Sequence, residues 1–282
     1  MPGWGADACH ARALHAWCQD ISDKVVGMQG LALEQEFRDF ARAPGSALAG
    51  GLLIGRVIEP ATDPDWVRAE LAGLARDVAE PSAQNLVDTL AVAGFGGAET
   101  YYAQSNSSIA HVLRTRRGIP ITLALVVLGV AEQLGLSASG INFPRHFLVA
   151  VERVLIDPFR MRPVAPAELD EAIAAQGLTA QDALVPAGPI DIMLRMLNNL
   201  RLLAEEQGDH ARALDFSGYQ LLISPDAFPV LVSRVDLWLG AGVPEMARRE
   251  LEQAIALAPD AAVAQQLEQR LVVIDAAPTQ LH

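Results

Sequence analysis

Cysteine is scarce in this 282-residue chain, which contains only Cys9 and Cys18. Both lie near the N-terminus, and neither a CxxC pair nor a Cys/His spacing typical of zinc sites accompanies them. Glycine-rich phosphate-binding loops, HExxH and EF-hand patterns are also absent. The sequence therefore predicts no metal and no other cofactor, and its cysteine usage is typical of the reducing cytoplasm.

Positive charge is also in short supply. Lys plus Arg number 21 and Asp plus Glu number 34, which gives a net charge of −13. An acidic chain repels phosphate backbones, so a nucleic-acid partner is not expected. The longest apolar run, residues 119–131, is shorter than the roughly 20 residues that span a bilayer. The N-terminal residues lack the basic-then-apolar pattern of a signal peptide, so we expect a cytoplasmic protein without a membrane partner.

Apolar periodicity predicts helices over residues 9–42, 64–80, 86–92 and 121–134. Asp63 is placed to cap the second of these helices, with Pro64 as its first residue. Strands are expected over 139–143, 147–151 and 154–156, the last two forming a hairpin around Glu152-Arg153. Residues 161–190 read as a connector with one helix over 166–176.

Three motifs in the centre of the chain are candidates for chemistry. Arg116-Arg117-Gly118-Ile119-Pro120-Ile121-Thr122 opens the apolar helix, His146 begins a strand, and Asp157 ends the next strand. This is the chain order of a papain-like or transglutaminase-like nucleophile–His–Asp site. Such a site needs a thiol at the helix start, where the helix dipole and an imidazolium favour the thiolate. Here the helix start provides Pro120 and Thr122, and no cysteine.

Each of these residues has two interpretations. Asp157 could orient the ring of His146 for catalysis, or the two could form a buried structural pair that ties the hairpin to the helix. Thr122 could be an alcohol nucleophile activated by His146, or an N-cap whose hydroxyl accepts from a backbone amide.

A second set of residues is predicted to line a cleft beside this motif. The arginines among them could bind a carboxylate or phosphate, or could pair with nearby acids such as Asp157 or Glu99. The tyrosines could equally be core residues with a bonded hydroxyl. The set consists of Tyr101, Tyr102, Asn106, Arg116, Arg117 and Arg145.

The C-terminal part of the chain repeats at an offset of 34 residues. Gly208 and Gly242 keep this offset, as do Ala213 and Ala247. Thirty-four residues is the period of the tetratricopeptide (TPR) repeat, a helix pair with glycine at its turn. The repeat predicts helix pairs over 192–206 with 210–223 and over 227–240 with 244–257, followed by a capping helix over 261–273.

The motifs together resemble the SirB-type family of bacterial proteins, which carry a transglutaminase-like domain followed by tetratricopeptide helices. The resemblance covers roughly residues 50–272 and implies descent from acyl-transfer enzymes. It places Pro120 where active relatives carry the nucleophilic cysteine, and it matches His146 and Asp157 to the other two triad positions. The chain departs from the family in Pro158-Phe159-Arg160-Met161, which lacks the glycines often found there.

We therefore expect an α+β protein. Residues 1–160 are predicted to form a mostly helical transglutaminase-like (papain-like) domain with a small antiparallel sheet, and 161–190 a connector. Residues 191–273 are predicted to form a two-repeat TPR-like array with its capping helix. The expected function is non-catalytic, with a protein or peptide partner bound through the repeats or the degenerate cleft. The alternative is a hydrolase or acyltransferase that uses His146 and Asp157 with Thr122 or water.

Overall fold

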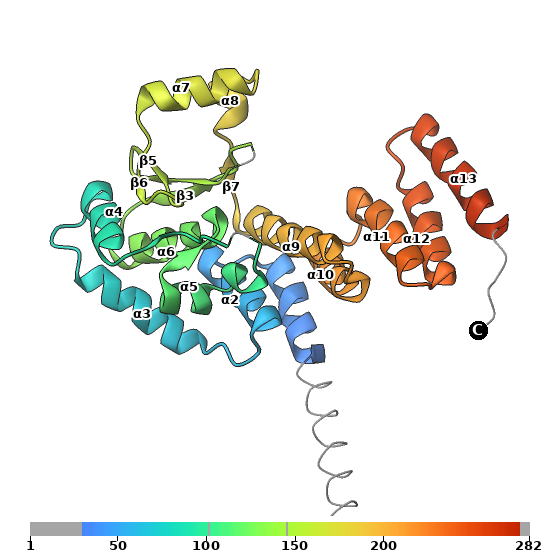
Figure 1. Cartoon of the computed structure of the whole chain (residues 1–282), viewed down its shortest axis with the longest axis horizontal. Helices are drawn as coiled ribbons and strands as arrows, with labels where there is room; N and C mark the ends of the chain where they lie inside the picture. Colours follow the sequence, from blue (N-terminus) through green and yellow to red (C-terminus); the bar gives the residue numbers. More distant parts are fainter. Residues whose placement is uncertain (1–29, 101, 145, 277–282) are drawn as a thin grey trace, which may run out of the picture.

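The computed structural model describes residues 30–100, 102–144 and 146–276 (Figure 1). Cys9, Cys18, Tyr101 and Arg145 lie outside these ranges, as does the first part of the helix predicted over 9–42. Its remainder is a helix over residues 30–42.

Helices built around one central apolar helix make up the first half of the structure. The central helix is α6 (Pro120–Gln133), which packs against α2 (Ala47–Ile58), α3 (Pro64–Arg76), α4 (Ala83–Val92) and α5 (Ile109–Thr115). It is buried on nearly every side, which explains an apolar run without an amphipathic stripe. The predicted cap of α3 is confirmed, because the Asp63 side chain accepts a hydrogen bond from the amide of Asp65 and Pro64 is the first helical residue.

A five-stranded antiparallel sheet covers α6. The strand order is β6 (Arg162–Pro163), β5 (Val154–Asp157), β4 (Leu148–Val151), β3 (Ala138–Ile141) and β7 (Pro186–Ala187). The predicted hairpin is confirmed, with Val151 opposite Val154. The two-residue strands β6 and β7 belong to the segment predicted as a connector.

The two faces of the sheet pack against different elements. Val149, Val151 and Ile156 belong to the main core with α6. Leu148 and Leu155 alternate with them and join a separate apolar cluster with residues of α7 (Pro166–Ala175) and α8 (Ala180–Ala183). Figure 1 shows α7 and α8 on the far side of the sheet from α6.

A short parallel ladder ties the start of α6 to the turn after β5. In it, β1 (Gly96–Gly97) pairs with β2 (Arg117–Gly118). The amide of Gly97 also donates to the carbonyl oxygen of Phe159 at 2.8 Å. A Cβ on Gly97 would lie within 2.6 Å of three ring carbons of Phe159, so only glycine fits here.

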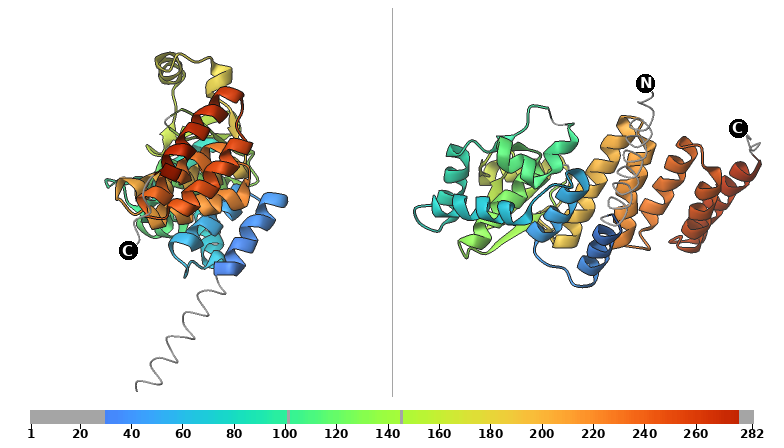
Figure 2. Two further views of the ribbon diagram at one scale, coloured as in Figure 1. Left: turned by 90° about the vertical axis from the view of Figure 1, so that its right-hand side faces the viewer. Right: turned by 90° about the horizontal axis from the view of Figure 1, so that it is seen from below.

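The C-terminal half is a row of antiparallel helices (Figure 2). They are α9 (Pro189–Glu206), α10 (His210–Ile223), α11 (Phe228–Gly240), α12 (Pro244–Ala256) and α13 (Ala261–Ala276). The helices predicted in the two pairs and the final helix are thus present. Residues of α9 and α10 join the main core, whereas α11, α12 and α13 enclose a cluster of their own.

Equivalent residues of the two helix pairs share local geometry. Gly208 and Gly242 both end a helix in the left-handed conformation, with φ of 72° and 76°. Ala213 and Ala247 are both fully buried, although Ala213 lies in the main core and Ala247 in the C-terminal cluster. In the second pair the guanidinium of Arg234 on α11 binds the carboxylate of Glu250 on α12, at 2.7 Å between Nη2 and Oε1.

None of the helices within the described ranges combines the length and the apolar character needed to cross a bilayer.

Candidate functional site

His146 precedes β4 and Asp157 ends β5, and the antiparallel pairing of these strands brings the two side chains together. Nε2 of His146 is 3.1 Å from Oδ1 of Asp157, so the pairing predicted from the sequence is present. The angle falls outside hydrogen-bond geometry, since Nε2 is buried without a hydrogen-bond partner among the described residues. The contact is therefore a close polar contact rather than an aligned hydrogen bond.

Asp157 is buried and held in its ionised form. Burial raises the pKa of its carboxyl. The adjacent imidazole of His146 and two backbone amides together lower that pKa by more than burial raises it, so the net pKa lies below the ordinary value. These amides belong to Phe159 and Arg160, which donate to Oδ1 at 2.9 and 3.1 Å. The carboxylate therefore fixes both the ring of His146 and the turn that follows β5.

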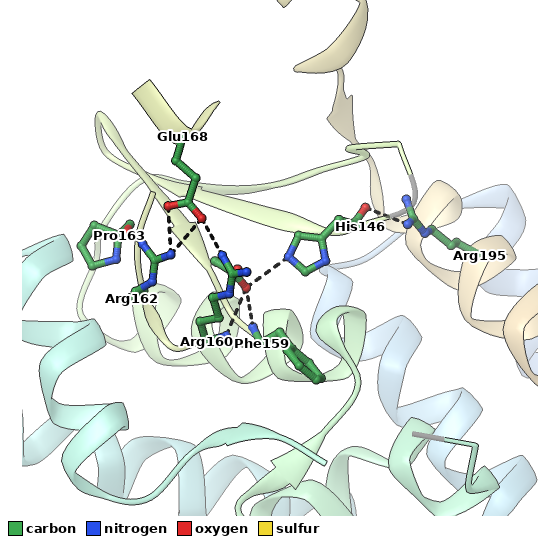
Figure 3. Close-up of polar contacts among 8 residues, drawn as sticks. His146, Phe159, Arg160, Arg162, Pro163, Glu168 and Arg195 are labelled. Atoms are coloured by element: carbon green, nitrogen blue, oxygen red, sulfur yellow. Dashed lines mark hydrogen bonds and ion pairs between the residues drawn. The ribbon is translucent and has the colours of Figure 1, made fainter. Parts of the chain in front are cut away.

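The turn after Asp157 is tied to α7 through Glu168. Nη1 of Arg160 and Nη2 of Arg162 donate to its Oε1 at 2.5 and 2.8 Å (Figure 3). The bond from Arg162 is the main reason that the pKa of Glu168 lies below its usual range. Between the two arginines, Met161 is buried and has a φ of 48°, the left-handed region that favours glycine.

Arg195 on α9 holds the loop that carries His146. Its Nη2 donates to the carbonyl oxygen of His146 at 2.7 Å, and its Nη1 donates to Asn142. Its guanidinium also lies 5.4 Å from the ring centroid of Phe147. Sequence reasoning missed this residue, because it is 49 positions from His146 and follows no motif.

A pocket of ≈ 400 Å³ adjoins the His146–Asp157 pair on the α7 side of the sheet. Both residues line this pocket, together with apolar side chains from the sheet face and α7 and with the ion pair of Arg160 and Glu168. The other lining residues are Phe143, Leu148, Phe159, Arg160, Val164, Glu168, Leu169 and Ala172.

The start of α6 supplies no reactive group to this pair. Pro120 is the first helical residue, and Ile119 occupies the cap position. The predicted N-cap role of Thr122 is therefore wrong, because Pro120 moves the cap upstream and leaves Thr122 third in the helix. Its hydroxyl oxygen is fully buried and has no hydrogen-bond partner within the described ranges, so no hydrogen bond joins it to His146.

The arginines before α6 are dispersed rather than gathered into one anion site. Arg114 pairs with Glu59 at 2.7 Å, and Nη2 of Arg116 lies 3.9 Å from Glu70. The guanidinium of Arg116 also lies 4.7 Å from the ring centroid of Phe95. Their acidic neighbours are thus glutamates of the helical layer, and not Asp157 or Glu99. Arg117 is an exposed residue of β2.

Of the other predicted cleft residues, the structure describes Tyr102 and Asn106. Tyr102 is exposed and lines a small pocket with Ile119 and Leu203 of α9. Asn106 is buried, and its amide nitrogen donates to the carbonyl oxygen of Thr100 at 2.6 Å. Tyr101 and Arg145 lie outside the described residues. In the described part of the chain, no group of three His, Cys, Asp or Glu residues is placed to hold a metal.

Comparison with known proteins identifies part of this architecture. Residues 65–198 match the Transglutaminase-like superfamily, a span that includes the His146–Asp157 pair and ends within α9. A UPF0162 protein of Pseudomonas aeruginosa is 28% identical over 247 residues, which cover 82% of this chain and 92% of that protein. A UPF0162 protein of Xylella fastidiosa is 31% identical over 176 residues, covering 58% of this chain and 63% of that protein.

A similarity to a eukaryotic protein is confined to about half of the chain. The human F-box only protein 21 is 29% identical over 164 residues, which cover 52% of this chain and 26% of that protein. No solved structure matches the chain significantly. The chain therefore contains a transglutaminase-like domain and is similar over most of its length to a UPF0162 protein.

Proposed function

We propose that this chain is a non-catalytic interaction protein of the SirB type, built on a degenerate transglutaminase-like domain and a TPR-like array. One observation carries the proposal: the helix start that would present a nucleophile begins with Pro120, and the nearby Thr122 hydroxyl is buried and not bonded to His146. Acyl transfer by this fold needs a nucleophile within hydrogen-bond reach of its base. In this proposal His146 and Asp157 shape a binding site.

The repeat assignment rests on several coincidences at one period. The helices begin and end within three residues of the predicted bounds, and the two turn glycines share a left-handed backbone. A pocket of ≈ 300 Å³ lies between the first helices of the two pairs, α9 and α11, and is lined by Arg201, Ser233 and Asp236 among others. We assign residues 191–273 to the array and this groove to a cytoplasmic protein or peptide partner.

The proposal is tested by assaying amide hydrolysis and transamidation together with thermal unfolding. The proteins are the wild type, His146→Ala, and the double variant Cys9→Ser, Cys18→Ser. We expect no turnover by any of them, and a lowered melting temperature for His146→Ala because Asp157 loses its neighbour. Turnover in the wild type that disappears in His146→Ala at an unchanged melting temperature would refute the non-catalytic role.

A second candidate function is hydrolysis with water in place of the missing nucleophile. It is favoured by the ionised Asp157 beside an imidazole whose side chain is 30% exposed and lines a pocket. Such a pair could orient His146 as a base for water. The same assay separates the two functions, because this candidate requires turnover that is insensitive to both cysteine substitutions.

A further inference from the structure

We propose that the pocket beneath α7 receives one uncharged apolar side chain of a bound peptide, whose backbone N–H donates to His146. This inference rests on the proposed function, because it names what the partner presents to the chain. Three properties of the pocket support it: the nature of its walls, the balance of its charges, and the hydrogen-bonding state of its histidine.

The walls of the pocket are apolar and its volume is small. Phe143 and Leu148 line it from the sheet side, and Val164, Leu169 and Ala172 line it from α7 and the segment before it. A volume of ≈ 400 Å³ lies near the lower end of ligand sites, which run from about 300 to 1,000 Å³. Such a site suits one aromatic or branched side chain rather than a long ligand.

The charged groups at the polar end of the pocket cancel one another. Asp157, Glu168 and Arg160 line the pocket, and Arg162, which lies outside the lining, supplies a second guanidinium to Glu168. Nε of Arg160 lies 3.8 Å from Asp157, and both arginines contact Glu168. A charged occupant would therefore lose its hydration without gaining an unpaired counter-charge, so the pocket favours an uncharged one.

His146 provides a directional polar contact for a ligand in this pocket. Its Nε2 faces the ionised carboxylate of Asp157, and this placement favours a proton on Nε2. In the tautomer that carries its proton on Nε2, Nδ1 has a lone pair, so its complement is a hydrogen-bond donor. The backbone N–H next to a peptide side chain supplies such a donor at the base of an apolar group.

Blocked amino acids test this assignment directly on the full-length chain. We expect N-acetyl-phenylalanine amide and N-acetyl-leucine amide to bind, as followed by protein-observed NMR titration. N-acetyl-phenylalanine with a free carboxylate and N-acetyl-lysine amide should bind much more weakly, because each adds a charge. Equal binding of the charged and uncharged probes would overturn the charge argument and with it the proposal.

Two substitutions on α7 locate the binding. Ala172→Phe fills the pocket and should weaken binding by about tenfold or more, the scale of losing a buried anchor contact. Ala174→Phe adds the same ring at an exposed position of the same helix and should leave binding unchanged. Leu169→Lys is a second test, should Ala172→Phe lower the melting temperature.

The outcomes separate this inference from the proposed function. If no blocked amide binds, or if pocket-filling and control variants bind alike, the pocket assignment is overturned while the non-catalytic role stands. If the amides are hydrolysed and Ala172→Phe blocks this, the pocket assignment is supported and the non-catalytic role is overturned.

Discussion

At the scale of single residues, Met161 illustrates a conformation that the sequence pattern could not reveal. Residues 158–161 contain no glycine, so their sequence does not say which residue takes the left-handed conformation. Met161 takes it, at a typical cost of about 1–2 kcal/mol for a residue with a side chain. Its side chain is 4% exposed and belongs to the main core, so burial offsets the strain.

Asp157 leads to a prediction about stability and pH. Asp157→Asn should lower the free energy of unfolding by about 1–3 kcal/mol at neutral pH, because it removes the charge beside His146 in a buried site. The folded-state pKa of Asp157 is depressed, so its contribution is present above the unfolded value of about 3.9 and is lost as pH falls through the folded value.

Urea unfolding at several pH values checks this prediction. The difference in the free energy of unfolding between wild type and Asp157→Asn should shrink as pH falls below about 4, and should vanish below the folded-state pKa, where the Asp157 carboxyl is protonated. Asp170→Asn, an exposed change on α7, is the control and should show no such trend. A difference that stays constant from neutral to acidic pH would contradict the assignment of an ionised, stabilising Asp157.

At the scale of elements, local signals predicted the helices and the hairpin, and long-range contacts limited the rest. The cap at Asp63 could be read from neighbouring residues, and the C-terminal helices could be read from the 34-residue offset. The strands β6 and β7 could not, because two residues carry no period, and β7 also pairs with the distant strand β3. The same limit applies to Arg195, whose contact with His146 forms only when α9 lies beside the loop.

The β1–β2 ladder gives a prediction for the turn that holds Asp157. Gly97→Ala should destabilise the protein by about 1–3 kcal/mol, because its Cβ would overlap the ring of Phe159. Displacing that ring should also shift the NMR signals of His146, since Phe159 donates its amide to Asp157. Gly73→Ala in α3 is the control and should be neutral or stabilising, because the nearest atom to its new methyl group is 3.7 Å away.

At the scale of the whole molecule, the repeat assignment predicts equal behaviour at equivalent turns. Gly208→Ala and Gly242→Ala should each lower the free energy of unfolding by about 1–2 kcal/mol, because both positions are left-handed. Backbone strain is the expected cause at both, since neither new methyl group has a neighbour within 4 Å. Urea unfolding measures both, with Gly218→Ala inside α10 as a control that should stabilise by up to about 1 kcal/mol. A large decrease in the free energy of unfolding at one turn and no decrease at the other would argue against equivalent repeats.

The hydrogen bond from Arg195 to the carbonyl oxygen of His146 means that the His146–Asp157 site depends on α9 for its geometry. The helix that carries Arg195 also contributes Met193, Met196, Leu197 and Leu200 to the main core. A chain that ended at β7 would lack α9, so it would expose the core surface that α9 covers and would lose the hydrogen bond that holds the loop carrying His146. Inheritance of the His–Asp pair is therefore tied to inheritance of α9, and the family match fits this, because it runs on to residue 198 and takes in Arg195.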